Sequence, residues 1–454
     1  MSRFQLVIVL VFGLFSCSKE DNTQEPIIEQ PTGYTQYGTP FSPIPNTEDI
    51  IMYEVNMRAF GTTSSLQNVI NRLDDIQALG VNTIWLMPIY PIGTINSVNS
   101  PYCVKNYKEI SSEYGTLSLL RAFTTQAHER GMTVILDWVA NHTSWDNPWI
   151  TEHSDWYTKN SAGQIIHPAG TNWTDVADLN FDNQAMRLEM IDVMKYWVLE
   201  ANIDGFRCDY ADGVPFSFWQ QAISSLNTIP NRNLIFLAEG NRTDHFSAGF
   251  QMTYAWDFYA KTKAIFNGEN AANLFLTNTS EYSTIPAGKH KIRFTTNHDE
   301  SAWDATPMTL FNGKNGSLAA SVASFFINGV PLLYTGQEVG RQNNVSFFSN
   351  TPIDWNTNPD MLLAYQNLLD FYKTSNAAKK GTLTAYPSND ILCFKKVFKD
   401  ESLLIFINVR NSSISFPIPI DFQNTTWTNA MTNSSENLGS SLNLNAYHYL
   451  ILKN

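Results

Sequence analysis

A repeating alternation of short apolar runs and longer helix-periodic segments constrains the fold more than any other feature of the sequence. It starts with the apolar run "IIMYEVN" (50–56), continues with a helical pattern at 65–80, and returns to an apolar run at 81–88. Short apolar runs between helices are typical of parallel strands, because such strands are covered on both faces. The predicted strands are 50–56, 81–88, 132–139, 203–208, 233–238, 249–254, 290–296 and 331–335. Eight strands that alternate with helices predict an α/β fold, a (β/α)8 TIM barrel.

The helices between these strands are predicted from apolar residues at helical spacing. Their ranges are 65–80, 117–131, 184–200, 216–226, 257–277, 316–328 and 359–374. An interruption at about 143–183 predicts a short insertion after strand three, and the barrel with this insertion is expected to span 48–378. Residues 379–454 change to alternation of period two, which predicts a C-terminal antiparallel β-sandwich domain.

The N-terminus has the pattern of an export signal. Residues 1–16, "MSRFQLVIVLVFGLFS", combine a basic residue, an apolar stretch too short to span a bilayer, and a small residue before Cys17. This pattern predicts a signal peptide. Residues 14–17 resemble the lipobox of bacterial lipoproteins, and the following "SKED" (18–21) resembles an acidic outer-surface signal, with an ordinary polar linker as the alternative. We therefore expect lipidation at Cys17, a flexible linker over 17–47, and a lipid anchor in the outer membrane at the cell surface.

Composition excludes some classes of function. The formal net charge is −13, from 42 acidic and 29 basic residues, which argues against a nucleic-acid partner because phosphate binding needs clustered Lys and Arg. The four cysteines match no zinc pattern, and Cys208 is expected to serve in packing only. The 12 Trp and 19 Tyr residues suit stacking on carbohydrate, although most large cores use such residues as well.

Polar residues gather at the predicted C-terminal ends of the strands, where barrels of this kind hold their active sites. They are Asp137, Asn141 and His142 after strand three, Arg207 and Asp209 on strand four, Glu239 after strand five, and His298 and Asp299 after strand seven. Arg207 and Asp209 are two residues apart and share one face of a strand, so a structural ion pair would explain that pair alone. Carboxylates left isolated near the barrel axis would be costly, and their gathering on one rim therefore predicts a polar site.

Four motifs occur in a fixed order along the chain: "DWVANH" (137–142), "GFRCD" (205–209), "LAEG" (237–240) and "TNHD" (296–299). Weaker similarities are "YEVNMRAF" (53–60), "VADLN" (176–180), "YTGQE" (334–338) and the loop "SPYCVKNYKEISSEYGT" (100–116). Together these stretches resemble glycoside hydrolase family 13, the alpha-amylase family. The resemblance covers about residues 50–450.

The resemblance implies a role for each strand-end residue. Asp209 would be the nucleophile that forms a covalent glycosyl-enzyme, and Glu239 the acid and base, with the two carboxyl groups about 5 Å apart. Arg207 is expected to keep Asp209 ionised, whereas Glu239 needs a raised pKa to start protonated. The third catalytic carboxylate would be Asp299, which holds sugar hydroxyls. The residues that the resemblance implies for substrate binding are Arg207, His142, His298 and the aromatic platform Tyr102.

The sequence departs from the family at two positions after the nucleophile. Asp212 and Gly213 stand where many alpha-amylases carry Lys-His, which binds the leaving-group sugar and a calcium ion. Asn141 and Asp178 match two other positions that often serve this calcium, and oxygen ligands are those that Ca²⁺ prefers. Asn141 and Asp178 could therefore hold a structural Ca²⁺, or they could form only hydrogen bonds between the barrel and the insertion. The sequence does not determine the metal ligands. The mechanism requires no cofactor.

The expected function is hydrolysis of α-1,4-glucosidic bonds in starch-type glucans or maltooligosaccharides with retention of configuration. The alternatives are cleavage of α-1,6 bonds, transglycosylation, or a surface glycan-binding protein without catalysis. The presence of all three carboxylates argues against the last of these. We expect an α-glucan as the partner molecule and a monomeric enzyme. Aromatic residues of the insertion either line the cleft or form its core, and these are Trp145, Trp149, Trp156, Tyr157 and Trp173.

Overall fold

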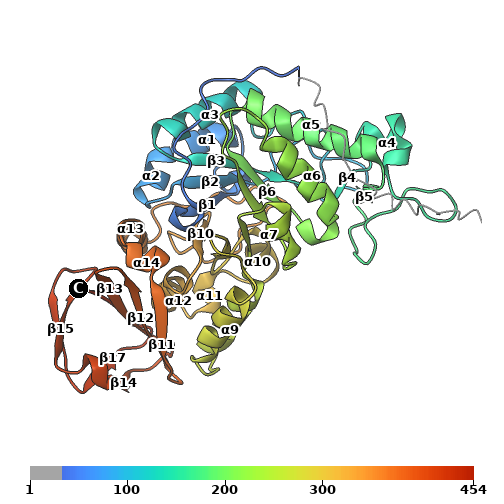
Figure 1. The fold of residues 1–454 in the computed structure, drawn as a ribbon. Coiled ribbons are helices and arrows are strands. Elements are labelled where there is room, and N and C mark those ends of the chain that lie inside the picture. The colour runs from blue at the N-terminus through green and yellow to red at the C-terminus, as the bar shows by residue number, and fades with distance from the viewer. Residues whose placement is uncertain (1–32) are drawn as a thin grey trace, which may run out of the picture. The chain divides into compact units, whose positions relative to one another are not determined.

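The computed structural model describes residues 33–454, and at its centre lies a closed barrel of eight parallel strands (Figure 1). The strands are β1 (Met52–Val55), β2 (Thr83–Leu86), β3 (Thr133–Trp138), β6 (Gly205–Cys208), β7 (Ile235–Ala238), β8 (Met252–Tyr254), β9 (His290–Arg293) and β10 (Val330–Tyr334). They follow one another around the barrel in chain order, and β10 closes it by pairing with β1. This confirms the predicted (β/α)8 barrel, with each strand inside its predicted range or within one residue of it.

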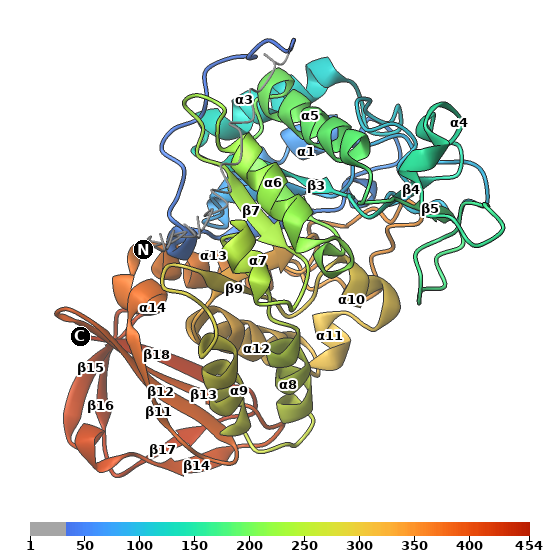
Figure 2. The same cartoon turned by 45° about the vertical axis from the view of Figure 1, so that its right-hand side comes forward.

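Helices surround the barrel (Figure 2). They are α1 (Ser65–Ile70), α2 (Leu73–Ala78), α3 (Leu117–Glu129), α5 (Gln184–Glu200), α6 (Phe216–Leu226), α7 (Asp244–Ala248), α8 (Trp256–Phe266), α9 (Asn273–Tyr282), α10 (His298–Trp303), α11 (Pro307–Leu310), α12 (Lys314–Phe326), α13 (Pro359–Thr374) and α14 (Asn376–Lys380). Three helices have the predicted bounds, namely α5, α6 and α13. For α5 the start is set by Asn183, whose side chain accepts the N–H of Met186 as an N-cap.

Two predicted helices were wrong in extent. The segment 257–277 forms two helices, because α8 ends at Phe266 and Gly268 then adopts a φ of +107° that a helix cannot contain. The segment 65–80 also divides, with a break at Asn71 and Arg72 between α1 and α2. In both cases the apolar spacing continues across a break that the periodicity alone does not reveal.

Two sets of buried side chains fill the barrel and its surroundings. Alternate residues of the strands point inward and form one cluster, with Met52, Trp85, Ile135, Leu237, Met252, Ile292 and Leu332 among its members. The intervening residues point outward and pack against the helices in a larger cluster. Cys208 belongs to this outer cluster and is fully buried, which confirms that it serves in packing.

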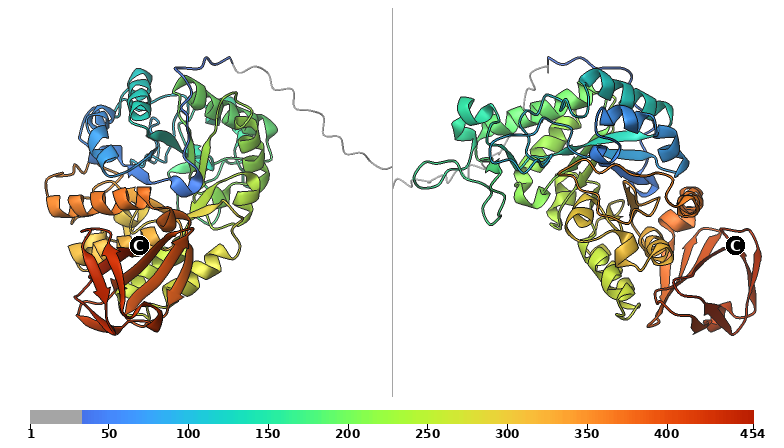
Figure 3. Two further views of the ribbon diagram at one scale, coloured as in Figure 1. Left: turned by 60° about the vertical axis from the view of Figure 1, so that its left-hand side comes forward. Right: turned by 180° about the vertical axis from the view of Figure 1, so that it is seen from behind.

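The insertion and the C-terminal strands lie on opposite sides of the barrel (Figures 1 and 3). The insertion pairs β4 (His142–Ser144) with β5 (Val176–Asp178) in antiparallel fashion and contains the short helix α4 (Trp149–Glu152). C-terminal residues form an antiparallel sheet in the order β11-β12-β13-β18-β15-β16 and a separate pair, β14 with β17. Their bounds are β11 (Thr382–Tyr386), β12 (Ile391–Phe398), β13 (Glu401–Asn408), β14 (Ile414–Pro417), β15 (Thr425–Asn429), β16 (Ser435–Leu438), β17 (Ser441–Leu444) and β18 (Tyr449–Lys453). This confirms the predicted C-terminal antiparallel domain.

Hydrogen bonds fix the C-terminal domain to the helices of the barrel and to the turns between them. The Arg410 guanidinium donates to the carbonyl oxygens of Ile265 and Glu269, at 2.5 and 2.6 Å. Asn312 Nδ2 donates to the Tyr447 hydroxyl at 2.8 Å. Within residues 33–454, no helix is both long and apolar enough to cross a membrane. The predicted signal peptide and Cys17 lie outside the described residues.

Candidate active site

A cavity of about 570 Å³ opens at the C-terminal ends of the barrel strands. Six of the residues predicted from the sequence line it together: Tyr102, His142, Asp209, Glu239, His298 and Asp299. They come from segments spread over about 200 residues of the chain, and the barrel topology brings them to one rim because every parallel strand ends on the same side. The seventh predicted residue, Arg207, lies fully buried beneath them.

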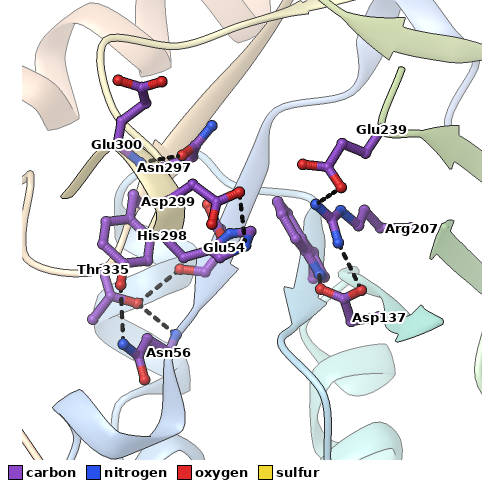
Figure 4. A network of polar contacts seen from close by, with 12 residues as sticks. Glu54, Asn56, Asp137, Arg207, Glu239, Asn297, His298, Asp299, Glu300 and Thr335 are labelled. Atoms are coloured by element: carbon purple, nitrogen blue, oxygen red, sulfur yellow. Dashed lines mark hydrogen bonds and ion pairs between the residues drawn. The ribbon is translucent and has the colours of Figure 1, made fainter. Parts of the chain in front are cut away.

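The buried guanidinium of Arg207 holds the carboxylates in place (Figure 4). Its Nη1 donates to Asp137 Oδ1 and to Asp209 Oδ1, each at 2.9 Å. Its Nη2 lies 2.9 Å from Glu239 Oε2, an ion-pair contact that lacks the alignment of a hydrogen bond. Its Nε donates to the Tyr254 hydroxyl at 3.2 Å. The Arg207–Asp209 pair is therefore one part of a network that joins three barrel strands, not an isolated structural ion pair.

Arg207 favours the ionised form of Asp209, as predicted, but burial and Glu239 act in the opposite direction. Burial raises the pKa of Asp209 well above its ordinary value, and the neighbouring charge of Glu239 raises it further. The positive charge of Arg207 lowers the pKa of Asp209, but it is shared among three carboxylates and does not offset these two effects. Ionised Asp209 thus depends on how protons are distributed over the neighbouring acids.

Glu239 follows β7 and is held by the backbone of the neighbouring loop. Its Oε2 accepts the N–H of Tyr210 at 2.7 Å, and its main-chain oxygen accepts the N–H of Ala211 at 2.9 Å. Tyr210 adopts a left-handed backbone with φ of +40°, which directs this N–H toward the carboxylate. The residue after the candidate nucleophile therefore orients the candidate acid.

Asp299 lies in the first turn of α10. The side chain of Asn297 caps this helix by accepting the N–H of Glu300 at 2.9 Å, which places His298 and Asp299 at the mouth of the barrel (Figure 4). Burial raises the pKa of Asp299 to about 7, with Glu239 as the next cause, although 35% of its side chain stays exposed in the cavity. Near neutral pH this carboxyl is therefore partly protonated.

His298 and Tyr102 form a stacked pair on the wall of the cavity. Their ring centroids are 5.3 Å apart with an interplanar angle of 20°, and the Tyr102 hydroxyl lies 2.7 Å from His298 Nε2. The same hydroxyl donates to Asp137 Oδ2 at 3.0 Å. On the other side of the imidazole, Nδ1 lies 2.5 Å from Glu54 Oε1. Tyr102 is thus an aromatic surface in the cavity whose ring is fixed by two polar partners.

Two acidic residues lie behind the cavity, and of these only Asp137 was among the polar residues that the sequence placed on the rim. Asp137 is fully buried and binds Arg207, Tyr102 and the indole N–H of Trp85, so it supports the site without lining the cavity. Burial raises its pKa to about 6. Glu54 lies on β1 inside a motif that the sequence did single out, but without a role. Neither the motif nor its spacing tells whether such a carboxyl faces the cavity or lies behind it.

His142 is the first residue of β4 and belongs to the cavity wall. Burial lowers the pKa of His142 to about 4, so the ring is neutral at ordinary pH and can both donate and accept a hydrogen bond. Its ring lies 5.6 Å from that of Trp173, centroid to centroid. A neutral imidazole at this place is suited to bind a sugar hydroxyl.

The structure separates the aromatic residues of the insertion into two groups. Trp173 lines the cavity, whereas Trp156 and Tyr157 are buried in the core. Trp145 and Trp149 are partly buried and pack against that core. Further aromatic residues of the cavity wall were not predicted, and these are Tyr210, Trp303, Phe347 and Phe348. Two of them could have been found from their positions in the sequence, because Tyr210 follows Asp209 directly and Trp303 comes four residues after Asp299.

Asp212 and Asp178 lie close to the positions at which the sequence was compared with a calcium site. Both carboxylate oxygens of Asp212 are engaged by the chain, since they accept from His245 and from the amides of Asn241 and Arg242. Asp178 lies on β5, in the insertion. Within residues 33–454, no group of three or more His, Cys, Asp or Glu side chains is arranged to hold a metal ion. The described residues therefore offer no cluster of acidic side chains for the calcium ion that the resemblance suggests.

Comparison with known proteins agrees with the barrel fold. The family model described as "Alpha amylase, catalytic domain" matches residues 56–269. The chain carries an alpha-amylase catalytic domain. It is 26% identical over 394 residues to Alpha-amylase 2 of Dictyoglomus thermophilum, which covers 82% of this chain and 68% of that protein. It is also 30% identical over 200 residues to Probable oligo-1,6-glucosidase 2 of Bacillus subtilis, covering 36% of this chain and 34% of that protein.

Solved structures extend the similarity to nine-tenths of the chain. The crystal structure of an alpha-amylase from Lactobacillus plantarum superposes with a TM-score of 0.80 at 27% identity, over 90% of this chain and 99% of that one. The similarity thus includes the C-terminal domain, which the family model does not reach. The enzyme is a glycoside hydrolase of the alpha-amylase type.

Proposed function

We propose that this enzyme hydrolyses α-1,4-glucosidic bonds of starch-type glucans or maltooligosaccharides with retention of configuration. The observation that carries the proposal is the convergence of three carboxylates, Asp209, Glu239 and Asp299, on one cavity. Arg207 contacts two of them at 2.9 Å. Relatives named as alpha-amylases support the linkage, while the oligo-1,6-glucosidase among them keeps α-1,6 cleavage as the alternative.

In the first half of the reaction, Asp209 acts as the nucleophile. Its carboxylate attacks the anomeric carbon, the glycosidic bond breaks, and Glu239 gives its proton to the departing oxygen. The products are a covalent glycosyl-enzyme and the shortened glucan, with a new hydroxyl where the bond was cut. Proton transfer leaves Glu239 ionised and ready to act as a base.

In the second half, Glu239 takes a proton from water. The resulting hydroxide oxygen attacks the same carbon, the bond to Asp209 breaks, and Glu239 is protonated again. Two displacements at one carbon retain its configuration. The positive charge of Arg207 stabilises Asp209 each time it leaves as a carboxylate, because the guanidinium is buried and donates to it directly.

Asp299 and the two histidines bind sugar hydroxyls in this scheme. Positive charge develops on the sugar ring as the bond breaks, and an ionised Asp299 favours that state over the ground state. Neutral His142 and the fixed ring of His298 supply further hydrogen bonds from two walls of the cavity. The rings of Tyr102 and Trp173 offer flat surfaces on which a glucose unit stacks.

Product analysis tests this proposal. Residues 18–454 are incubated with amylose, pullulan and isomaltooligosaccharides, with Glu239→Gln in parallel. Release of maltooligosaccharides from amylose by the unchanged protein, and not by the variant, supports α-1,4 hydrolysis with Glu239 as the acid. Release of panose or isomaltose-type products moves the assignment to a neopullulanase or an α-1,6 enzyme. Binding without release from any glucan contradicts catalysis.

We also infer that the enzyme is a lipoprotein of the outer membrane, anchored through Cys17 and facing the cell surface. The support is the signal-like segment 1–16 followed by a lipobox-like sequence and acidic residues. A polymeric glucan cannot cross the envelope intact, so an enzyme that cuts it at the surface would make fragments small enough for uptake. Fractionation of cells expressing Cys17→Ser tests this: the protein should leave the membrane fraction, and retention there would contradict a lipid anchor.

A further inference from the structure

Asp212 joins the loop after β6 to the loop after β7. Its Oδ2 accepts the N–H of Asn241 at 2.9 Å, and its Oδ1 accepts the N–H of Arg242 at 3.3 Å. His245 Nε2 lies 2.7 Å from the same Oδ1. In addition, the Arg242 guanidinium donates to the main-chain oxygen of Asp212 at 3.1 Å. One carboxylate therefore connects the loop that carries Asp209 to the loop that carries Glu239.

The residue after Glu239 packs directly on this connection. A Cβ atom at Gly240 would lie 2.3 Å from Asp212 Oδ1 and 2.8 Å from His245 Nε2. Both distances are shorter than any ordinary contact, so only glycine allows the loop to approach the pair this closely. The position of the main chain next to Glu239 thus depends on where the Asp212–His245 pair lies.

The connection continues to the carboxyl group of Glu239 itself. Residues 210 and 211, which immediately precede Asp212, donate their N–H groups to Glu239 Oε2 and to its main-chain oxygen. Tyr210 holds its φ at +40°, a conformation that a residue other than glycine keeps only when its surroundings impose it. Asp212 anchors the far side of this strained turn and thereby maintains the donor that orients Glu239.

The environment of the pair suits a fixed anchor. His245 is fully buried, and within the described residues its Nδ1 has no hydrogen-bond partner. Its ring contacts Phe250 edge-on at 5.5 Å, so the ring cannot move to seek another partner without leaving the core. Burial alone would raise the pKa of Asp212, but the hydrogen bonds from His245 and from the two amides bring it below the ordinary value. Asp212 is therefore an ionised carboxylate with every contact directed at the loop of Glu239.

We propose that Asp212, together with His245, is a positioning residue pair that holds Glu239 for proton transfer to the glycosidic oxygen. The pair touches neither the cavity nor the reacting atoms and acts through the 210–212 turn and Gly240. This inference rests on the proposed function, since it assumes that Glu239 is the acid. Its consequence is specific: loss of the pair impairs substrates that need a proton on the leaving group and spares substrates that do not.

Two substrates separate these cases. Cleavage of maltopentaose requires protonation of a sugar oxygen, whereas α-maltosyl fluoride releases fluoride, which needs no acid. The parameter compared is kcat/KM, because it reports the steps up to the first bond cleavage. For Asp212→Ala and His245→Phe we expect kcat/KM on maltopentaose to fall by about 10²-fold, the loss typical of a misplaced catalytic group, with α-maltosyl fluoride changed by less than about threefold. Glu239→Gln provides the reference pattern.

Controls make each outcome decisive. Thr243→Ala removes an exposed side chain of the same loop that makes no capping hydrogen bond, and it should leave both substrates unaffected. Asp212→Asn keeps the side-chain volume and one acceptor oxygen, so it should lose less, about tenfold on maltopentaose, and it replaces Asp212→Ala if that variant does not fold. Equal losses on both substrates in a folded variant, or no loss on either, would overturn the proposal. Inactivity of the unchanged protein on both would overturn the proposed function and this inference with it.

Discussion

Glu54 Oε1 lies 2.5 Å from His298 Nδ1, and this contact joins the first strand of the barrel to the start of α10, which follows the seventh strand. Thr335, the residue after β10, reinforces it, since its hydroxyl donates to the main-chain oxygen of Glu54 at 2.7 Å (Figure 4). The carboxylate therefore determines how the imidazole of His298 faces Tyr102 and the cavity. Burial raises the pKa of Glu54, and the contact with His298 opposes that rise.

Replacement of Glu54 should reduce activity through His298. Glu54→Leu removes the acceptor and leaves Nδ1 unpaired in the core, which costs about 1.5–3 kcal/mol for a hydrogen bond to a charged group. If this energy is used to bind the transition state, kcat/KM on maltopentaose falls by about 10- to 100-fold. Glu54→Gln keeps an acceptor oxygen and should retain more activity than Glu54→Leu. Equal activity of the two variants would show that the contact does not position His298.

The raised pKa of Asp299 predicts how stability varies with pH. A carboxyl whose pKa is about 4 when unfolded and about 7 when folded binds its proton more tightly in the folded protein. Asp299 therefore destabilises the fold progressively as pH rises from about 4 to 7, and the full cost is present above that range. Asp299→Asn carries no charge, so its Tm should exceed that of the unchanged protein by an amount that grows over this window. Thermal unfolding by circular dichroism at pH 4 to 8 measures the difference.

A surface carboxylate gives the matched control for this measurement. Asp360 is paired with Lys314 on the protein surface, and this contact lowers its pKa. The Tm difference for Asp360→Asn should not become more positive between pH 4 and 7. A Tm difference for Asp299→Asn that is independent of pH, or that falls with rising pH, would contradict the raised pKa.

The fold was predictable because its signals are local. Each strand is a short apolar run, and helices such as α5 and α13 start at residues with clear initiation signals, Asn183 and Pro359. The prediction of one helix over 257–277 failed because apolar spacing continued through Gly268, and the sequence alone does not show that this glycine takes a positive φ. The spacing of side chains thus predicted one continuous helix, whereas the backbone conformation of Gly268 divides the segment into two.

The candidate site was predictable only in part. Strand ends converge in any barrel, so Asp209, Glu239 and Asp299 could be placed on one rim from the topology and the resemblance. The aromatic wall could not, because Phe347 and Phe348 lie in a long loop after β10 whose sequence has no period that relates it to the strands. The sequence also could not show how charges are paired in the site. It placed one arginine beside Asp209, whereas in the structure Arg207 contacts Asp137, Asp209 and Glu239.

Trp303 should affect the binding of long glucans. It ends α10, is 71% exposed, and packs edge-on against Phe348 at 5.4 Å on the cavity wall. An exposed indole at the margin of the cavity can stack on a glucose unit beyond those near the carboxylates, a contact of about 0.5–1.5 kcal/mol. Trp303→Ala should therefore raise KM for maltoheptaose about three- to tenfold and leave KM for maltotriose nearly unchanged. As the control, Leu276→Ala removes another exposed side chain, 68% exposed on α9, and should change KM for neither sugar. An equal rise of KM for both sugars with Trp303→Ala would exclude a remote stacking site.

Removal of divalent cations should not impair the enzyme. Asp212 has both carboxylate oxygens occupied by hydrogen-bond donors of the chain, and residues 33–454 contain no cluster of acidic, histidine or cysteine side chains suited to a metal ion. Stability that depended on bound calcium would be lost on chelation, because a ligand that binds only the folded state stabilises it by an amount that grows with the free ligand concentration relative to Kd. We therefore expect the same Tm and the same kcat/KM on maltopentaose with EDTA, after dialysis, and with added Ca²⁺. A Tm that falls with EDTA and recovers with Ca²⁺ but not with Mg²⁺ would contradict this, and Asn141→Ala and Asp178→Ala would then show whether the ion binds between the barrel and the insertion.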